Sequence, residues 1–264
     1  MKQRIDVPAA FQDIQREWEA YYPPSPIYEK TLFHYTTGHG LEGITKSKSL
    51  WASAARYSND LSEVRYACDL ALPVIDEMML EFKGNDHRRF FDVLRLCFST
   101  PEWADQDAFM VSFCETADLL SQWRGYGPGN GYAIGFDLVK ERAVQMTTTQ
   151  RIRLLLRQVD YELESQKKSL TKFLHNGGSL LSKMLTAYKS DEVLPIVLAR
   201  VRYSLAEWMY TIKHPTFNQE HEWKLLAIPP KAINNFPGFL EFGDAYDSYA
   251  GINARVVGNR MVPI

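Results

Sequence analysis

The stretch Thr31-Leu32-Phe33-His34-Tyr35-Thr36 has the alternation of a β-strand and decides where the main domain begins. Because successive side chains of a strand point to opposite faces, His34 is predicted on one face and Tyr35 on the other. The segment shortly before it, Pro23-Pro24-Ser25-Pro26, cannot continue a helix. We therefore predict a boundary near residue 30, with the first strand of the main domain directly after it.

Upstream of this strand, residues 9–22 predict an amphipathic helix. Phe11, Ile14 and Trp18 recur at spacings of three and four residues, which places them on one helix face. Residues 1–30 are therefore expected to form a helical extension that packs on the main domain, residues 31–264.

Downstream, the pattern runs from strands to helices and back to strands. Helices are predicted over 41–47, 60–82 and 87–99, and strands near 50–53 and over 108–113, 132–136 and 152–161. Residues 162–210 are mainly helical, with breaks expected near Gly177-Gly178 and before Pro195. Further strands are predicted over 222–228, 239–242, 253–257 and 261–262. Because regular βαβ alternation is missing, this order predicts an α+β fold with a helical insertion at about 162–211.

The composition excludes several classes of protein. The 264 residues are 45% hydrophobic, and 30 Lys+Arg against 32 Asp+Glu give a net charge of −2, unlike a strongly basic DNA-coating protein. No apolar run approaches the ~18 residues of a membrane helix, and the first six residues lack the apolar stretch of a signal peptide. Three cysteines without metal-ligand spacing predict reduced core thiols and, with them, a cytoplasmic protein.

The first candidate site is His34-Tyr35-Thr36, at the end of the opening strand and just before a glycine turn. Functional residues gather at strand ends, which favours a site here. The structural alternative is a hydrogen-bonded core histidine, which is common for a lone histidine on a strand.

The second candidate site contains Trp123, Arg124 and Tyr126. Arg124 is a planar double donor suited to a phosphate or carboxylate, and the two aromatic rings can stack a flat heteroaromatic ring. The structural alternative makes Trp123 a core residue and pairs Arg124 with Asp60 or Glu63. These two acids have the spacing of a capping box, which explains them as the start of a helix.

The third candidate site is the stretch Asn218-Gln219-Glu220-His221-Glu222-Trp223-Lys224. On a strand, Glu220, Glu222 and Lys224 share one face. If that face is exposed, it is an ordinary solvated surface. If it lines a cleft, two carboxylates can hold a sugar hydroxyl and stabilise a positively charged transition state.

The candidate sites follow one another in a specific order of motifs. The order is Phe33-His34-Tyr35-Thr36, then Ser121-Gln122-Trp123-Arg124-Gly125-Tyr126-Gly127, then Glu220-His221-Glu222-Trp223. In this order, residues 31–264 resemble a widespread bacterial family of a domain of unknown function, found in some genomes near phage-defence genes. That family in turn is similar to the ADP-ribosyltransferase fold, in which two small, mainly antiparallel β-sheets clasp NAD.

The resemblance implies NAD as the substrate and assigns roles to particular residues. It implies as NAD-binding residues His34, Tyr35, Thr36, Trp123, Arg124 and Tyr126, and as catalytic residues Glu220 and Glu222. His34 would bind a ribose of NAD, and Tyr126, or alternatively Trp123 or Tyr35, would stack the nicotinamide. Glu222 would hold the ribose 2′-hydroxyl, and Glu220 would be the companion acid that orients the acceptor.

The implied activity is transfer of ADP-ribose to a protein or nucleic acid by a toxin or defence effector, with an antitoxin as a further partner. Simple NAD hydrolysis needs the same pocket. No metal is expected, because breaking the nicotinamide–ribose bond builds positive charge that a carboxylate stabilises. Residues 138–200 hold 11 Lys+Arg and 6 Asp+Glu, a charge of +5 that would suit a nucleic-acid acceptor.

Two alternatives stay open. One is a metal-dependent nuclease built on Glu222-Trp223-Lys224, although the 30 residues before Glu222 contain no aspartate to complete its motif. The other is a non-catalytic module that binds NAD or a nucleotide as a sensor.

Overall fold

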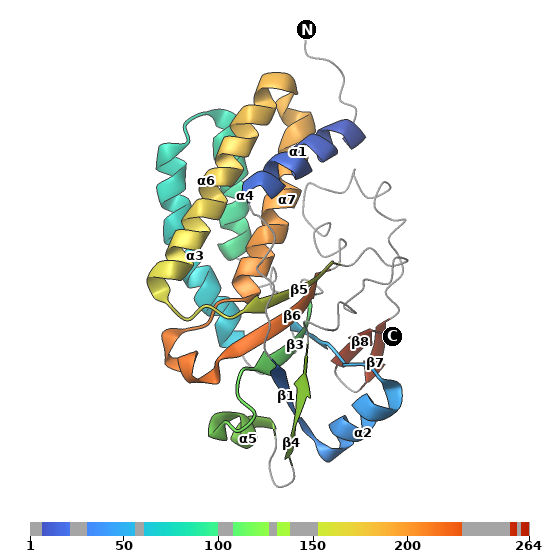
Figure 1. Ribbon diagram of the computed structural model, residues 1–264. Coiled ribbons are helices and arrows are strands. Elements are labelled where there is room, and N and C mark those ends of the chain that lie inside the picture. Colours follow the sequence, from blue (N-terminus) through green and yellow to red (C-terminus); the bar gives the residue numbers. More distant parts are fainter. Residues whose placement is uncertain are drawn as a thin grey trace.

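The computed structural model describes residues 7–21, 31–55, 61–99, 108–126, 131–137, 153–228, 254–257 and 260–263. A bundle of helices lies on one side of an antiparallel sheet (Figure 1), so the predicted α+β class is confirmed. None of the helices in these ranges combines the length and the apolarity that crossing a membrane requires.

The helices and strands follow the predicted order. The helices are α1 Val7–Tyr21, α2 Gly38–Ser47, α3 Leu61–Glu81, α4 Asn85–Ser99, α5 Leu120–Tyr126, α6 Leu163–Ala187, α7 Ser190–Tyr210 and the 3-10 helix η3 Pro215–Glu220. The strands are β1 Leu32–Thr37, β2 Ser53–Ala54, β3 Phe109–Cys114, β4 Gly131–Phe136, β5 Arg153–Gln158, β6 Glu222–Ile228, β7 Ala254–Val257 and β8 Arg260–Pro263. Helix α5 and η3 are additional, and the strand predicted over 239–242 lies outside the described residues.

The strands of the first and third candidate sites, β1 and β6, belong to one sheet. Its order is β4-β1-β3-β6-β5, with β2 paired to β3, and all of its pairs are antiparallel. Phe33 of β1 lies opposite Cys114 of β3, and Cys114 lies opposite Glu222 of β6. Strands β7 and β8 pair with each other in a separate two-stranded sheet. The finer expectation of two sheets that clasp a cleft stays a prediction.

Strand alternation gives the large sheet two different faces. Met110 of β3 and Leu226 of β6 belong to the large hydrophobic core that the sheet shares with the helices. Phe113 and Trp223, on the same two strands but at alternate positions, belong to a smaller apolar cluster with Leu32 of β1. One face of the sheet is therefore covered by the bundle, and the other carries its own apolar cluster.

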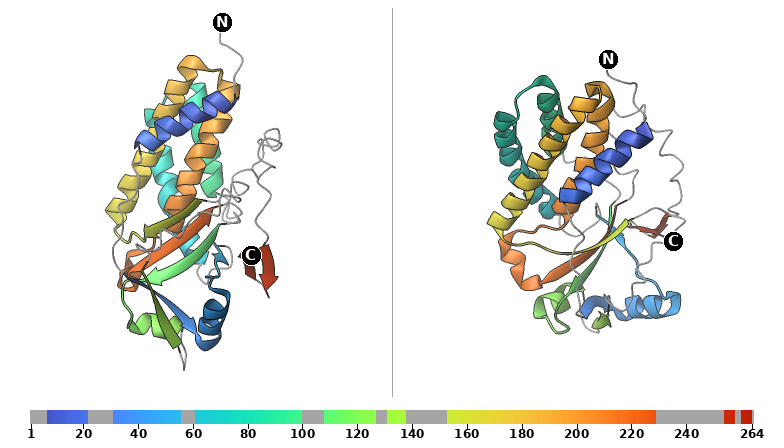
Figure 2. Two further views of the ribbon diagram at one scale, coloured as in Figure 1. Left: turned by 45° about the vertical axis from the view of Figure 1, so that its right-hand side comes forward. Right: turned by 45° about the horizontal axis from the view of Figure 1, so that its top comes forward.

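The helical layer consists of α1, α3, α4, α6 and α7, which Figure 2 shows beside the sheet from two further directions. Helix α1 packs on α6 and α7, and its Ile14 and Trp18 are buried as the periodicity predicts. Phe11 of the same helix is 40% exposed. The helical region at 162–211 shares its core with α3 and α4, so the bundle combines α1 with two further helical parts of the chain.

The break predicted at Gly177-Gly178 is wrong, because α6 continues through both glycines. A Cβ atom on Gly178 would lie only 2.7–2.9 Å from ring atoms of Phe82. The glycines therefore let a neighbouring element approach α6 closely, which is a packing role rather than a helix-ending one. The second break, predicted before Pro195, is found at Tyr188-Lys189, and Pro195 itself lies inside α7.

Candidate functional site

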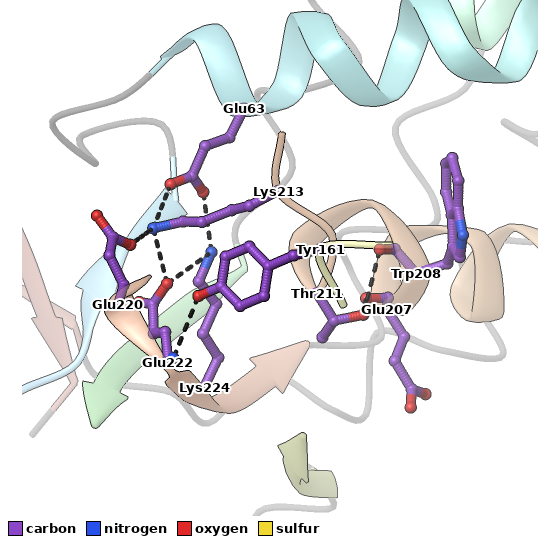
Figure 3. Close-up of polar contacts among 9 residues, drawn as sticks. All are labelled: Glu63, Tyr161, Glu207, Trp208, Thr211, Lys213, Glu220, Glu222 and Lys224. Carbon is purple, nitrogen blue, oxygen red and sulfur yellow. Dashed lines mark hydrogen bonds and ion pairs between the residues drawn. The ribbon is translucent and has the colours of Figure 1, made fainter. Parts of the chain in front are cut away.

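A group of three glutamates and two lysines lies between the bundle and the start of β6 (Figure 3). Glu63 is in the first turn of α3, and Lys213 follows the end of α7. Glu220 ends η3, and Glu222 and Lys224 are on β6. These five residues, from distant parts of the chain, are termed the Glu-Lys cluster.

Lys213 is at the centre of the Glu-Lys cluster. Its Nζ lies 2.8 Å from Glu63 Oε1 and 2.7 Å from Glu220 Oε2, and the same nitrogen lies 2.7 Å from Glu222 Oε2. Lys224 Nζ lies 2.8 Å from Glu63 Oε2 and 3.9 Å from Glu222 Oε2. The Lys224 side chain is only 2% exposed. Buried charges are stable in a protein only when they are paired, and each lysine here meets more than one carboxylate.

A turn at residue 221 brings Glu220 and Glu222 to the same cation. Pro215 begins η3, whose last residue is Glu220, and His221 then adopts a left-handed backbone with a φ of 44°. The two carboxylates therefore reach Lys213 from the end of η3 and from β6. The expectation that they share one face of a single strand is corrected by this turn.

Burial and charge pairing compete at the members of the Glu-Lys cluster. Burial alone would raise the pKa of Glu222, but the two lysines and a hydrogen bond from Ser112 outweigh it and hold the pKa below its usual value. Burial would lower the pKa of Lys213, but the surrounding carboxylates, Glu222 and Glu63 first, outweigh it and raise the pKa. At neutral pH, Glu222 is therefore a carboxylate and Lys213 an ammonium.

Tyr161 adds a phenol to the edge of the Glu-Lys cluster (Figure 3). Its hydroxyl oxygen accepts a hydrogen bond of 3.1 Å from the backbone N–H of Glu222. Burial raises the pKa of this hydroxyl, so it stays protonated at neutral pH. The Glu-Lys cluster therefore has a protonated phenol hydroxyl next to the first residue of β6.

The arrangement of the three carboxylates does not fit a metal ion. Their oxygens converge on the ammonium of Lys213, which already supplies the positive charge at that point. Among the residues that the structure describes, no three His, Cys, Asp or Glu side chains are grouped to hold a metal. A metal ion at this point would have to replace Lys213 as the partner of the three carboxylates.

Glu63 has partners that its capping-box spacing does not predict. Both of its carboxylate oxygens contact lysines, Lys213 through Oε1 and Lys224 through Oε2. Asp60 lies outside the described residues, so the cap itself stays a prediction. Both Glu63 oxygens thus contact lysines rather than Arg124, the partner that the structural alternative gave Glu63.

His34 lies on the opposite face of the sheet from Glu222. Because Cys114 is in register with both Phe33 and Glu222, these two residues share a face and His34 points the other way. The His34 ring packs against Phe113 with 5.9 Å between ring centroids, and its Nδ1 lies 2.9 Å from a carbonyl oxygen of β3. Burial lowers the pKa of His34, so the imidazole ring is uncharged at pH 7. The structure therefore does not bring His34 and Glu222 together on one face of the sheet.

Tyr35 and Trp123 make a structural unit at the start of α5. The Tyr35 hydroxyl donates to the Thr116 carbonyl at 2.7 Å and accepts from the Leu119 N–H at 2.9 Å. Trp123 packs edge-on against Tyr35 with ring centroids 4.7 Å apart, and its indole N–H donates to Asp118. These contacts hold the turn before α5 and give both rings structural partners.

The remaining predicted residues lie near this unit. Thr36 is half-buried on β1, opposite Tyr132 of β4, and Arg124 is exposed on α5. Tyr126 ends α5, but its side chain lies outside the described residues. The structure thus brings Glu220 and Glu222 together, whereas the contacts of Tyr35 and Trp123 are with the turn before α5.

No motif in the sequence marked Lys213, Tyr161 or Ser112 as a site residue. One usable signal was present at Lys224, which is charged although its same-face neighbour on the strand, Leu226, is apolar. A charged side chain on a buried face needs a partner of opposite charge. That requirement predicts a compensating acid on the covering layer, which the structure shows to be Glu63.

One family model matches part of the chain, covering less than half of its 264 residues. Residues 122–225 match the model of a family described as a protein of unknown function, DUF2971. The match runs from α5 into β6, so it includes Lys213, Glu220, Glu222 and Lys224 but not Glu63. It supports the expected domain of unknown function and does not extend to ADP-ribosyltransferases. The comparisons with curated proteins and with solved structures gave no match.

Proposed function

We propose that the chain is an NAD-consuming, ADP-ribosyltransferase-like enzyme whose reaction centre is the Glu-Lys cluster. The observation that supports this proposal is Glu222, a buried carboxylate that two lysines keep ionised, with Glu220 at the same cation. The sequence resemblance suggests the substrate, and the Glu-Lys cluster offers the negative charge that the reaction needs. His34 is not part of the proposed centre.

NAD cleavage requires negative charge beside the ribose. The bond between the nicotinamide nitrogen and ribose C1′ breaks, and both electrons leave with nicotinamide as a neutral molecule. Positive charge then spreads over C1′ and the ring oxygen, and a fixed carboxylate in a site with little water stabilises it by several kcal/mol. A nucleophilic atom of the acceptor bonds to C1′ and releases its proton. With water as the acceptor, the same step is NAD hydrolysis.

Access to Glu222 requires Lys213 to move. The Glu222 side chain is 8% exposed, whereas those of Glu63 and Glu220 are 16% and 22% exposed. We therefore assign the first contact with the ribose to Glu220. The Lys213–Glu222 ion pair is then exchanged for a contact between Glu222 and the ribose 2′-hydroxyl. Lys213 keeps its other two carboxylates during this exchange, so its charge is not left unpaired.

A metal-dependent nuclease is the second candidate, and one observation favours it. Glu63 supplies the acid that the Glu222-Trp223-Lys224 motif lacks upstream, since its Oε2 lies 2.8 Å from Lys224. The convergence of the carboxylates on Lys213 argues against it. Mg²⁺-dependent cleavage of a nucleic acid by the purified protein would favour the nuclease.

The test of the proposed function is nicotinamide release from NAD, measured with protein and nucleic-acid acceptors. Glu222→Gln removes the charge with little change of shape, and we expect it to lower release by about 100-fold. Glu207→Gln is the matched control, because Glu207 pairs with Arg157 between α7 and β5, outside the Glu-Lys cluster. It is expected to keep the wild-type rate.

Two outcomes would contradict the enzyme proposal. The first is no nicotinamide release by the wild-type protein with any acceptor. The second is NAD binding that survives Glu222→Gln without turnover in either protein, which would support the sensor module. The toxin or defence role rests on the resemblance alone. Expressed in bacterial cells, the wild-type protein and Glu207→Gln are expected to stop growth, and Glu222→Gln is not.

A further inference from the structure

Gln166 of α6 is a fully buried amide that contacts the backbone of Lys213. Its Nε2 donates to the carbonyl oxygen of Lys213 at 2.8 Å and to that of Asp160 at 2.6 Å. Its Oε1 accepts a hydrogen bond of 2.6 Å from the Tyr66 hydroxyl. A neutral amide has two N–H groups and one oxygen, and all three are used here.

These contacts add to an existing link between two chain segments. Asp160 and Ile212 form an isolated parallel bridge, in which Asp160 N donates to Thr211 O at 2.8 Å and Lys213 N donates to Asp160 O at 3.1 Å. Gln166 then bonds the two carbonyls of Asp160 and Lys213 from the side of the bundle. Both the N–H and the C=O of Lys213 are therefore held.

An apolar residue would suit the position of Gln166 if packing alone mattered. The next buried positions at helical spacing along α6 are Leu170 and Leu174, and all three side chains are fully buried. A leucine at 166 would continue this apolar face, but it would leave the carbonyl oxygens of Asp160 and Lys213 without the amide. The amide of Gln166 therefore serves the backbone of Asp160 and Lys213 rather than the packing of α6.

Helix α3 acts on both the ammonium and the backbone of Lys213. Glu63 and Tyr66 are three residues apart and so lie on neighbouring parts of one helix face. Glu63 contacts the ammonium directly, and Tyr66 holds the backbone through Gln166. The position of Lys213 is therefore set relative to α3 as well as to β6.

We propose that Gln166, supported by Tyr66, is a positioning residue that places Lys213 against Glu222 and so keeps the Glu-Lys cluster in its ionised arrangement. The catalytic side of this inference rests on the proposed function. The placement of Lys213 does not, because the ionisation of Glu222 is measurable without any substrate.

The groups around Glu222 come from several elements. Those that act on it directly are Lys213 after α7, Lys224 on β6, Tyr161 after β5, and Cys114 and Ser112 on β3. Glu63 on α3 and Glu220 at the end of η3 share the ammonium of Lys213 with it. Of the two lysines, only Lys213 is bonded to Gln166. Loosening Lys213 is therefore expected to make the Glu222 carboxylate easier to protonate, while Lys224 still favours its ionised form.

The test is the acid titration of the Glu222 carboxyl, followed by carbon NMR of glutamate-labelled protein and assigned with Glu222→Gln. Gln166→Met keeps a similar shape and removes both donors, and we expect it to raise the titration midpoint by about one pH unit. Tyr66→Phe removes only the supporting hydroxyl and is expected to shift the midpoint less, in the same direction. Ser204→Ala is the control, because it deletes a buried hydrogen bond from Trp18 in the same bundle. Its midpoint is expected to stay at the wild-type value.

The activity gives a second measurement. If the proposed function holds, the acid limb of kcat for NAD cleavage shifts to higher pH in Gln166→Met by the same amount as the titration. An unchanged Glu222 midpoint in both variants overturns the positioning role, whatever the activity does. A wild-type protein that does not cleave NAD overturns the proposed function, and the titration still decides the role of Gln166. If Gln166→Met does not fold, Tyr66→Phe decides the question.

Discussion

The two faces of the sheet contain different chemistry although the same strands build both. On the face toward the bundle, Glu222 and Lys224 meet charged side chains from α3 and from the segment after α7. On the other face, Trp223 packs with Phe113, and His34 lies beside the same ring. Moving by one residue along β6 therefore changes a paired charge into an apolar contact.

The layer that covers each face of the sheet decides what that face can do. Charges on a buried face are stable only as a complete set, so removing one member leaves the others unpaired. An apolar face responds to the area that is lost, which gives smaller and more graded effects. Substitutions on the two faces should therefore differ in size, in pH dependence and in their effect on activity.

The largest effect is expected for Lys224→Met, on the charged face. The variant leaves Glu63, Glu220 and Glu222 with Lys213 as their shared lysine. We expect the free energy of unfolding to fall by about 3–5 kcal/mol. Urea denaturation measures this loss. Lys183→Met is the control, since Lys183 pairs with Glu17 at the surface, where such a pair contributes less than about 1 kcal/mol. Equal losses in the two variants would contradict the distinction between the faces.

The second expected difference between the two faces is the pH dependence of the free energy of unfolding. The pKa of Glu222 is lowered in the folded protein, so the unfolded chain binds a proton more readily as the pH falls. The stabilisation from Glu222 is present above the ordinary glutamate pKa and is lost as the pH falls through the folded value. Glu222→Gln should therefore flatten the decline in unfolding free energy on the acid side.

The matched variant on the other face is Trp223→Phe. It loses the hydrogen bond from the indole N–H to Glu115 and some apolar area, but no pairing of Glu222. Its unfolding free energy should be lower than wild type at pH 7, with the wild-type slope on the acid side. An acid decline in Glu222→Gln that runs parallel to wild type would show that the charged face does not govern the response to acid.

The sequence was sufficient to predict the strands that carry these faces, because alternation and helical periodicity are local properties. The strand β6 is observed at Glu222–Ile228, as predicted, and β1 begins one residue after its predicted start. Local pattern could not predict that Glu63 meets Lys224. That contact depends on which helix covers which face, and tertiary packing decides this.

The candidate site was predictable only in part for the same reason. Glu220 and Glu222 were expected together and do meet, although through Lys213 and a turn at His221 rather than along one strand. The pairing of His34 with Glu222 was implied by the family resemblance, which rests on the order of motifs and carries no information about strand register in this chain. In the structure, the opposition of Phe33 and Cys114 places His34 on the other face.

The smallest effect is expected for His34→Asn, on the apolar face. Asparagine can keep a donor toward β3, and the lost ring contact with Phe113 should cost about 0.5–1 kcal/mol. Because the pKa of His34 is lowered by burial, the unfolded chain takes up a proton first as the pH falls below the usual histidine value of 6.5. The wild-type protein should lose some stability there, and His34→Asn should lose less.

Nicotinamide release by His34→Asn should stay at the wild-type rate, because the proposed centre lies on the opposite face. A large loss of release in a stably folded His34→Asn would instead require His34 in the reaction centre, and the separation of the two faces would then fail as an account of function.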